Sequence, residues 1–186
     1  HSNFSQSVEK QTIQGAVKSN SMSSIRFDRN GDLLGACYVE ATLPAQDTTA
    51  DNWCNRVGFR LLKQVELRVG GQMIDRQYST WMHVWTELTH TTDQKALLDK
   101  LVGAKGTDGA VVADAAVSAT TLNVPLLFSF CRNPGLALPL IALQYHEVEI
   151  HIEFETLARC MSDGTTSQSG SLSNTSLWVD YVFLDA

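Results

Sequence analysis

The 186-residue chain has few charged side chains and no long apolar run. Charged residues make up 18% of the sequence, whereas an average soluble domain has about 25%. The apolar stretch at 136–143 is far shorter than the roughly 20 residues that a membrane-spanning helix needs, so we expect no transmembrane segment. A low charge fraction combined with ordinary hydrophobicity indicates that much of the surface is buried against other subunits.

Clusters of basic residues are absent as well. The 14 Lys and Arg residues are scattered along the chain, and the formal net charge at pH 7 is −6. Proteins that bind nucleic acid through its phosphates usually gather Lys and Arg on one face. We therefore expect no direct contact with nucleic acid.

The sequence has no CxxC pair and no glycine-rich phosphate-binding loop. Its four cysteines are widely and unevenly spaced, which argues against a zinc site. One of them lies within an apolar, strand-like run, where a small buried thiol is usual. We expect free, mostly buried thiols in a reducing compartment, and we assign no catalytic, cofactor-binding or metal-binding residue. The cysteines are Cys37, Cys54, Cys131 and Cys160.

What the sequence does contain is period-two alternation of apolar and polar residues, which is typical of strands. It is clear at 33–44 (LLGACYVEATLP) and at 64–75 (QVELRVGGQMID), where Gly70-Gly71 predicts a tight hairpin turn. About eight strands result from this pattern. The other strand candidates are 8–17, 23–28, 72–78, 120–130, 145–155 and 176–185.

Helical patterns are few and short. Residues 79–89 place four apolar side chains on one face at the i, i+3, i+4, i+7 spacing, and 91–103 begins with a capping box of Thr91 and Gln94 and ends at Gly103. The apolar face of the first helix predicts packing in the core or at an interface; a sugar-stacking platform is the alternative. Its members are Trp81, Val84, Trp85 and Leu88.

The length is sufficient for one domain with a real core, and neither a repeat nor a linker divides the chain. Two small-residue stretches, 103–121 and 162–176, are predicted to be long exposed loops. A parallel α/β fold would need a helix between most strands. We therefore predict an all-β fold, an antiparallel sandwich or jelly roll over residues 1–186 with short helices inserted between strands.

The stretch YHEVEIHIEFE (145–155) is rich in His and Glu. A zinc-protease motif needs two His four residues apart on a helix, but His151 follows His146 by five residues in an alternating run. A weaker possibility is a cation at a subunit boundary, held by Glu149, His151 and Glu153, which follow one face of a strand at steps of ~6.6 Å. We interpret the stretch as a strand with one polar face.

Two other motifs have simpler interpretations. DRNGD (28–32) resembles the start of a calcium-binding loop but lacks the Gly and Glu that an EF-hand needs at its sixth and twelfth positions. Asn30-Gly31 therefore predicts a hairpin turn. The N-x-S/T sequons at Asn3 and Asn174 are interpreted as chance matches, because no secretory signal is recognisable. The chain starts with His1 rather than Met, so we expect a fragment or a processed product.

Long blocks of the sequence resemble the major capsid proteins of the large nucleocytoplasmic DNA viruses. These blocks are VELRVGGQMIDRQYSTWMHVWTELT (65–89), PLLFSFCRNPGLALPLIALQYHEVEIHIEF (125–154), RNGDLLGACYVEATLP (29–44) and WVDYVFLDA (178–186). They come from both ends and the middle, so the resemblance covers nearly the whole chain.

The resemblance implies a structural protein of the virion capsid rather than an enzyme. Residues 1–186 would form an eight-stranded jelly roll, the first of two in the full-length chain. The full-length chain would form a homotrimer, a pseudo-hexagonal capsomer that contacts neighbouring capsomers and minor capsid proteins. The icosahedral shell would assemble in the host cytoplasm over an internal membrane. Alternatives are a single jelly-roll vertex (penton) protein, a sugar-binding module, and a metal-dependent cupin-like enzyme, which the absence of an H-x-H pair argues against.

One segment has a specific place in this interpretation. Pro134, Gly135 and Pro139 break the strand pattern before residue 145, which suits a chain that crosses from one sheet to the other. Because the segment is apolar yet irregular, we hypothesise that it lies buried near the junction of neighbouring jelly rolls. No individual subunit-interface residue follows from the sequence.

Overall fold

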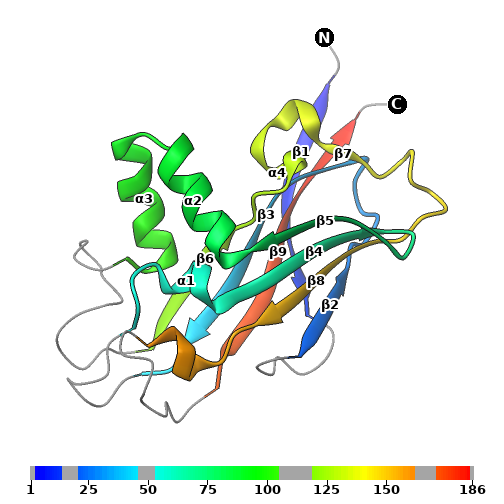
Figure 1. The fold of residues 1–186 in the computed structure, drawn as a ribbon. Helices are drawn as coiled ribbons and strands as arrows, with labels where there is room; N and C mark the ends of the chain where they lie inside the picture. Colours follow the sequence, from blue (N-terminus) through cyan, green and yellow to red (C-terminus); the bar gives the residue numbers. More distant parts are fainter. Residues whose placement is uncertain (1–2, 14–20, 46–52, 105–118, 162–170, 185–186) are drawn as a thin grey trace.

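The computed structural model describes residues 3–13, 21–45, 53–104, 119–161 and 171–184. They form two antiparallel sheets packed face to face, with helices at one side (Figure 1). The strands are β1 (Phe4–Thr12), β2 (Met22–Arg26), β3 (Leu33–Leu43), β4 (Leu62–Val69), β5 (Gln72–Tyr78), β6 (Thr120–Pro125), β7 (Leu138–Pro139), β8 (Val148–Phe154) and β9 (Ser173–Leu184). The helices are α1 (Val57–Leu61), α2 (Ser79–Thr89), α3 (Thr92–Val102) and α4 (Ser129–Arg132), with 3₁₀ turns η1 (Pro134–Leu136) and η2 (Leu157–Cys160).

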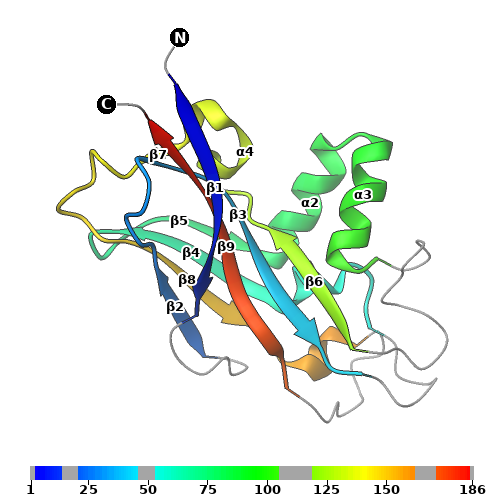
Figure 2. The same cartoon turned by 180° about the vertical axis from the view of Figure 1, so that it is seen from behind.

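The strand order is that of a jelly roll. The first sheet has the order β1-β9-β3-β6, with the two-residue β7 added beside β3, and the second has the order β2-β8-β4-β5. Figure 2 shows the first sheet from behind, with the start of β1 next to the end of β9. The prediction of an all-β antiparallel sandwich is confirmed. β7 is the one described strand that the sequence pattern did not indicate.

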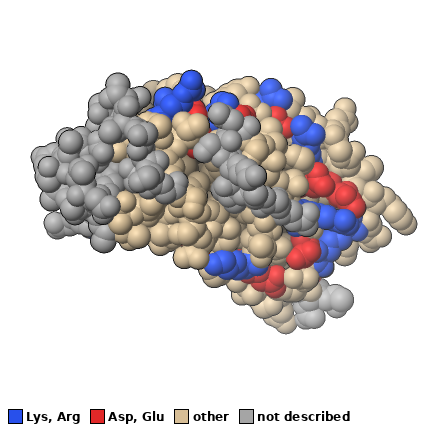
Figure 3. All heavy atoms as spheres, turned by 90° about the horizontal axis from the view of Figure 1, so that it is seen from below, with Lys and Arg blue, Asp and Glu red and all other residues tan. Residues whose placement is uncertain are grey.

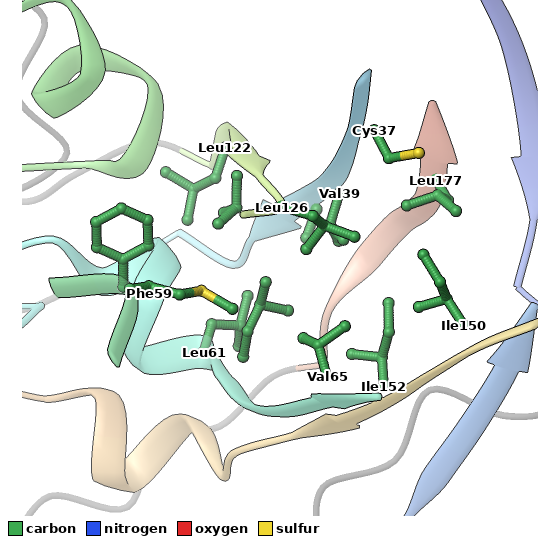
Figure 4. Close-up of a cluster of buried hydrophobic side chains, with 14 of the residues drawn as sticks. Cys37, Val39, Phe59, Leu61, Val65, Leu122, Leu126, Ile150, Ile152 and Leu177 are labelled. Carbon is green, nitrogen blue, oxygen red and sulfur yellow. The ribbon is translucent and has the colours of Figure 1, made fainter. Parts of the chain in front are cut away.

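The core lies between the two sheets, and alternation along the strands builds it. In β8, residues Val148, Ile150, Ile152 and Phe154 are buried, while the residues between them are only partly covered. Figure 4 shows Ile150 and Ile152 of one sheet close to Leu177 of the other. Burying one such side chain contributes about 1.5–3 kcal/mol, so this pattern fixes which face of each strand points inward.

Both predicted helices are present. α2 has the predicted bounds, and α3 starts with the predicted capping box: the Thr91 hydroxyl accepts from the Gln94 amide, and the Gln94 side chain accepts from the Thr91 amide. Gly103 ends α3 in the left-handed conformation at φ 77°, which a glycine adopts without strain. Among the described residues, no helix is long and apolar enough to cross a membrane.

The hairpin predicted at Gly70-Gly71 is confirmed. These glycines connect β4 and β5, which pair antiparallel, and their φ angles are +58° and +79°. Positive φ at both positions is what a two-residue turn of this hand requires.

The hairpin predicted at Asn30-Gly31 is wrong. β2 and β3 lie in different sheets, so this stretch carries the chain across the sandwich. There is little room for a side chain at Gly31, because a Cβ atom there would lie 3.0 Å from the Cβ atom of Tyr181. Asn30 donates to Glu9 at 2.6 Å, and Asp32 accepts from the Leu184 amide at 2.7 Å. These contacts attach the crossing to β1 and to the end of β9.

Several predicted boundaries need correction. The strand predicted to run to residue 130 ends at Pro125, because Phe128 and Phe130 turn inward and stack on each other with centroids 5.8 Å apart. α4 then begins at Ser129. The strand predicted at 8–17 begins at Phe4 and ends at Thr12, and the loop predicted to reach residue 176 gives way to β9 at Ser173. Most of both predicted loops lies outside the described residues.

Candidate functional site

The polar side chains of β8 that were considered for a cation are paired within this chain. Glu149 and His151 bond each other at 2.9 Å, and Glu153 accepts from Lys63 at 2.6 Å. Each member of the row considered for a cation therefore already has a partner from this chain. His146 lies before β8, beside the hairpin turn at Gly70, and so does not converge with His151. In the described ranges, no group of three His, Cys, Asp or Glu is placed to hold a metal ion.

On β4, next to this row, Glu66 is a buried carboxylate that the sequence pattern did not single out. It is 1% exposed and accepts from Gln64, Arg68 and Arg76, with the two arginines at 2.7 and 2.8 Å. Burial raises the pKa of Glu66, but the hydrogen bond from Arg68 and the charges of both arginines outweigh it and hold the pKa below its usual value. The ionised carboxylate thus ties β4 to β5.

A second ionic cluster, centred on Arg56 at the start of α1, joins α1 to α2 and α3. This guanidinium is 7% exposed and donates to Asp99 of α3 at 2.6 Å and to Glu87 of α2 at 2.5 Å. Lys95 also bonds Glu87, at 2.7 Å. These hydrogen bonds from Lys95 and Arg56 lower the pKa of Glu87 to about 2. Arg56 itself has φ 54°, a strained conformation for a non-glycine residue that this cluster holds in place.

The outward side of α2 is apolar. Trp81 and Val84 are each 44% exposed, and Leu88 is 78% exposed. Together with the half-buried Trp85 they form what we call the α2 surface. Core packing, one of the two structural interpretations of this face, is wrong for the three exposed residues within this chain. Exposed apolar groups that gather on one helix face mark an interaction site.

A different pair of α2 residues packs on the sandwich. Met82 and Thr86 are fully buried, and the Thr86 hydroxyl donates to the Met82 carbonyl at 2.9 Å. The sequence pattern predicted the helix correctly but did not show which side of it faces the sandwich. Met82 and Thr86 are only two residues, one helical turn apart, and the two tryptophans form a much stronger apolar pattern on another side. The apolar stripe is therefore available for contact with a partner.

The arrangement of the two tryptophans does not favour sugar stacking. The Trp81 and Trp85 rings contact each other at a centroid distance of 5.5 Å with their planes tilted by 39°. The Arg132 guanidinium of α4 lies 4.6 Å from the centre of the Trp85 ring. This cation–π contact occupies a face that a sugar would use, and only Trp81 offers an open ring.

Comparison with known proteins decides the family. The family model described as "Major capsid protein N-terminus" matches residues 1–185. The chain belongs to this family. Over its whole length it is 40% identical to the major capsid protein of Pyramimonas orientalis virus and 37% identical to that of Phaeocystis pouchetii virus. It spans 46% and 43% of those two relatives, which is less than half of either.

Solved structures of capsid proteins have the same fold. A quasi-atomic model of the PBCV-1 virus capsid contains a chain that matches all of this one with a TM-score of 0.86 and 32% identity, over 43% of that chain. The Faustovirus major capsid protein matches with a TM-score of 0.77 at 15% identity, over 55% of its length. The second likeness concerns the fold alone.

In this member of the capsid-protein family, the segment between β6 and β8 lies mostly on the surface. It crosses from one sheet to the other, as predicted. Leu140 is buried, but Leu136, Ile141 and Tyr145 are 56%, 58% and 94% exposed. The segment is therefore not buried by its own jelly roll, and its burial against a neighbouring one stays a prediction. Arg29 holds the segment through hydrogen bonds to the carbonyls of Leu143, Gln144 and His146.

Charge on the capsid-family jelly roll is mixed rather than segregated. Figure 3 shows acidic and basic side chains next to one another on the face seen from below. Exposed ion pairs such as Arg26 with Glu147, at 2.8 Å, also occur among the described residues. The described part of this face offers no extended basic patch of the kind that a nucleic acid would need.

Proposed function

We propose that this chain is the N-terminal part of a major capsid protein that builds the icosahedral shell of a large double-stranded DNA virus and has no catalytic role. The observation that carries the proposal is the match of the capsid-protein family model to residues 1–185. The jelly-roll strand order and the exposed α2 surface, which suit a building block with large contact areas, support it.

In this proposal residues 1–186 are one jelly roll, the first of two in the full-length chain. Support comes from the relatives, of which the chain spans 46% and 43%, so that a second domain of similar size has room. Three full-length copies would form a pseudo-hexagonal capsomer, which would contact neighbouring capsomers and minor capsid proteins. Assembly would take place in the host cytoplasm, near an internal membrane and without direct contact with the genome.

We assign the α2 surface to a neighbouring copy within that trimer. α2 lies on the opposite side of the sandwich from β1 and the end of β9 in both views (Figures 1 and 2). The matched family is the N-terminal part of longer proteins, so the following domain would begin near the end of β9. A neighbouring copy is therefore the better placed partner for Trp81, Val84 and Leu88.

The test is quantitative mass spectrometry of purified virus particles from the source organism. Tryptic peptides of this chain, such as residues 64–68, should be among the most abundant in intact particles, because a shell protein is present in many copies. Absence of these peptides from particles, with the protein abundant in infected cells, would overturn the proposal.

A further inference from the structure

The four cysteines, which are scattered in the sequence, lie as two pairs in the fold. One pair joins Cys37 of β3 to Cys131 of α4, and the other joins Cys54, before α1, to Cys160 of η2. All four are free thiols. No cysteine is left over, and neither pair is explained by the proposed function.

The first pair converges on a single carbonyl. The Cys37 sulfur lies 3.6 Å from the Gly35 carbonyl oxygen, and the Cys131 sulfur lies 3.9 Å from the same oxygen. Burial, together with the neighbouring Cys131 thiol, raises the pKa of Cys37 well above its usual value. Two sulfurs that both approach one carbonyl oxygen can be brought to bonding distance by small changes in side-chain rotamer.

The second pair sits in an antiparallel register. Trp53 and Met161 form an antiparallel bridge, which places Cys54 directly opposite Cys160, and the Cys54 amide donates to the Cys160 carbonyl at 2.8 Å. Opposed residues in such a hydrogen-bonded position have Cα atoms about 5.5 Å apart. That separation is at the centre of the range that disulfides adopt.

Each pair has one buried thiol and one that a small molecule can reach. Cys37 and Cys160 are buried. Cys131 lines a cavity of about 410 Å³ that also includes Trp85. Cys54 lines a second cavity, of about 400 Å³, beside α1 and α2. A small oxidant entering either cavity therefore meets the accessible thiol of a pair.

We propose that the two pairs are latent disulfides, Cys37–Cys131 and Cys54–Cys160, which close when the protein meets an oxidised small-molecule disulfide such as glutathione disulfide. The thiolate of Cys131 or Cys54 attacks one sulfur of glutathione disulfide, forms a mixed disulfide and expels one glutathione. The buried partner then loses its proton and attacks the protein-bound sulfur, which expels the second glutathione. The protein loses two electrons and two protons per pair, and both are carried by the two reduced glutathione molecules.

Such disulfides would cross-link segments that are far apart in the sequence. Cys37–Cys131 would join α4 to β3, and Cys54–Cys160 would join the chain before α1 to η2. Burial raises the pKa values of Cys37, Cys54 and Cys160, the last to about 12. These three thiols are therefore slow to react at neutral pH, and closure becomes faster as the pH rises.

The test is native oxidation of the purified protein with glutathione disulfide, followed by alkylation of the remaining thiols and peptide mapping. We expect loss of all four alkylation sites, linked peptides that contain only the two native pairs, and a melting temperature raised by at least about 5 °C. Persistent alkylation of all four cysteines, stable glutathione adducts, or crossed pairs such as Cys37–Cys54 would overturn the inference.

Two variants test the pairs separately. Cys131→Ser removes only the first pair and should leave Cys54–Cys160 able to form, and Cys54→Ser should do the reverse. Both replace a half-buried thiol, so the fold tolerates them better than changes at the buried partners. If the Cys54–Cys160 linkage fails to form in Cys131→Ser protein that melts as the parent does, independent pairing is wrong. Oxidation of the denatured protein, which should scramble the pairs, shows that the fold selects them.

Discussion

At the scale of single residues, stability depends on a few buried charged groups that each have several polar partners. Glu66 is the clearest case, because three donors surround a carboxylate that is 1% exposed. Arg56 has a similar role between the start of α1 and the helices α2 and α3. The sequence shows both as ordinary charged residues, since some of their partners, among them Arg76, Glu87 and Asp99, are distant in the chain.

Glu66→Gln should destabilise the fold by about 1–3 kcal/mol, because Arg68 and Arg76 lose the negatively charged carboxylate that both of them contact. The native pKa of Glu66 lies below its ordinary 4.5, so its stabilisation is present above that value and is lost as the pH falls through the lowered native pKa. The free energy of unfolding in urea should therefore fall less steeply with decreasing pH for the variant than for the parent protein.

The matched control is Glu147→Gln, which breaks the exposed ion pair with Arg26. Both of these side chains are about half exposed, so the change should cost less than about 1 kcal/mol. Equal losses of stability in the two variants would contradict the account of Glu66.

Gly58 is present because there is no room for a side chain. A Cβ there would lie 2.7 Å from a methyl group of Val124 and 3.0 Å from the Val102 carbonyl. Gly58→Ala should therefore destabilise the protein by about 1–3 kcal/mol in denaturant unfolding. Gly135→Ala, whose nearest contact is 3.4 Å away, is the control and should be close to neutral.

At the scale of elements, local signals were sufficient for the strands and helices whose pattern is strong. The alternation in β3 and β8 and the capping box of α3 depend on residues next to one another in the sequence, and all were predictable. Which sheet a strand joins, and which side of α2 faces inward, depend on distant contacts. For that reason the crossing at Asn30-Gly31 and the exposure of Trp81 were not predictable.

The two sides of α2 should respond differently to truncation. Met82→Ala removes a fully buried side chain and should cost about 2–5 kcal/mol of folding free energy. Leu88→Ala changes a residue that is 78% exposed and should alter stability by less than about 0.5 kcal/mol. Thermal and urea unfolding of both variants measure the difference, and a loss at Leu88 comparable to that at Met82 would contradict the assignment of the inward face.

At the scale of the whole molecule, the jelly-roll fold and the family match both indicate a structural building block of a capsid. Its assembly can be tested by experiment. The long blocks of resemblance are sufficient to predict the family from the sequence, whereas the contact surface can be located only in the folded structure. Composition alone indicated buried surface through its 18% of charged residues. The α2 surface is a part of the described structure to which we assign such a buried contact.

The double substitution Trp81→Asp and Leu88→Asp should prevent trimer formation by the full-length protein without unfolding it. Two carboxylates cannot be desolvated in an apolar contact without a large cost, while both positions are solvent-exposed in the isolated jelly roll. Sedimentation velocity with circular dichroism gives assembly and fold together. Thr80→Asp, an exposed change on the same helix, should still form trimers. A trimeric double variant would rule out the α2 surface as the subunit contact.

The most direct test of the central claim is the native mass of the full-length source protein, measured by light scattering alongside denaturing mass spectrometry. The account predicts a chain more than twice as long as these 186 residues, since they span 46% and 43% of two relatives, and a native mass of three such chains. A stable monomer consisting of this 20.5 kDa jelly roll alone would contradict it.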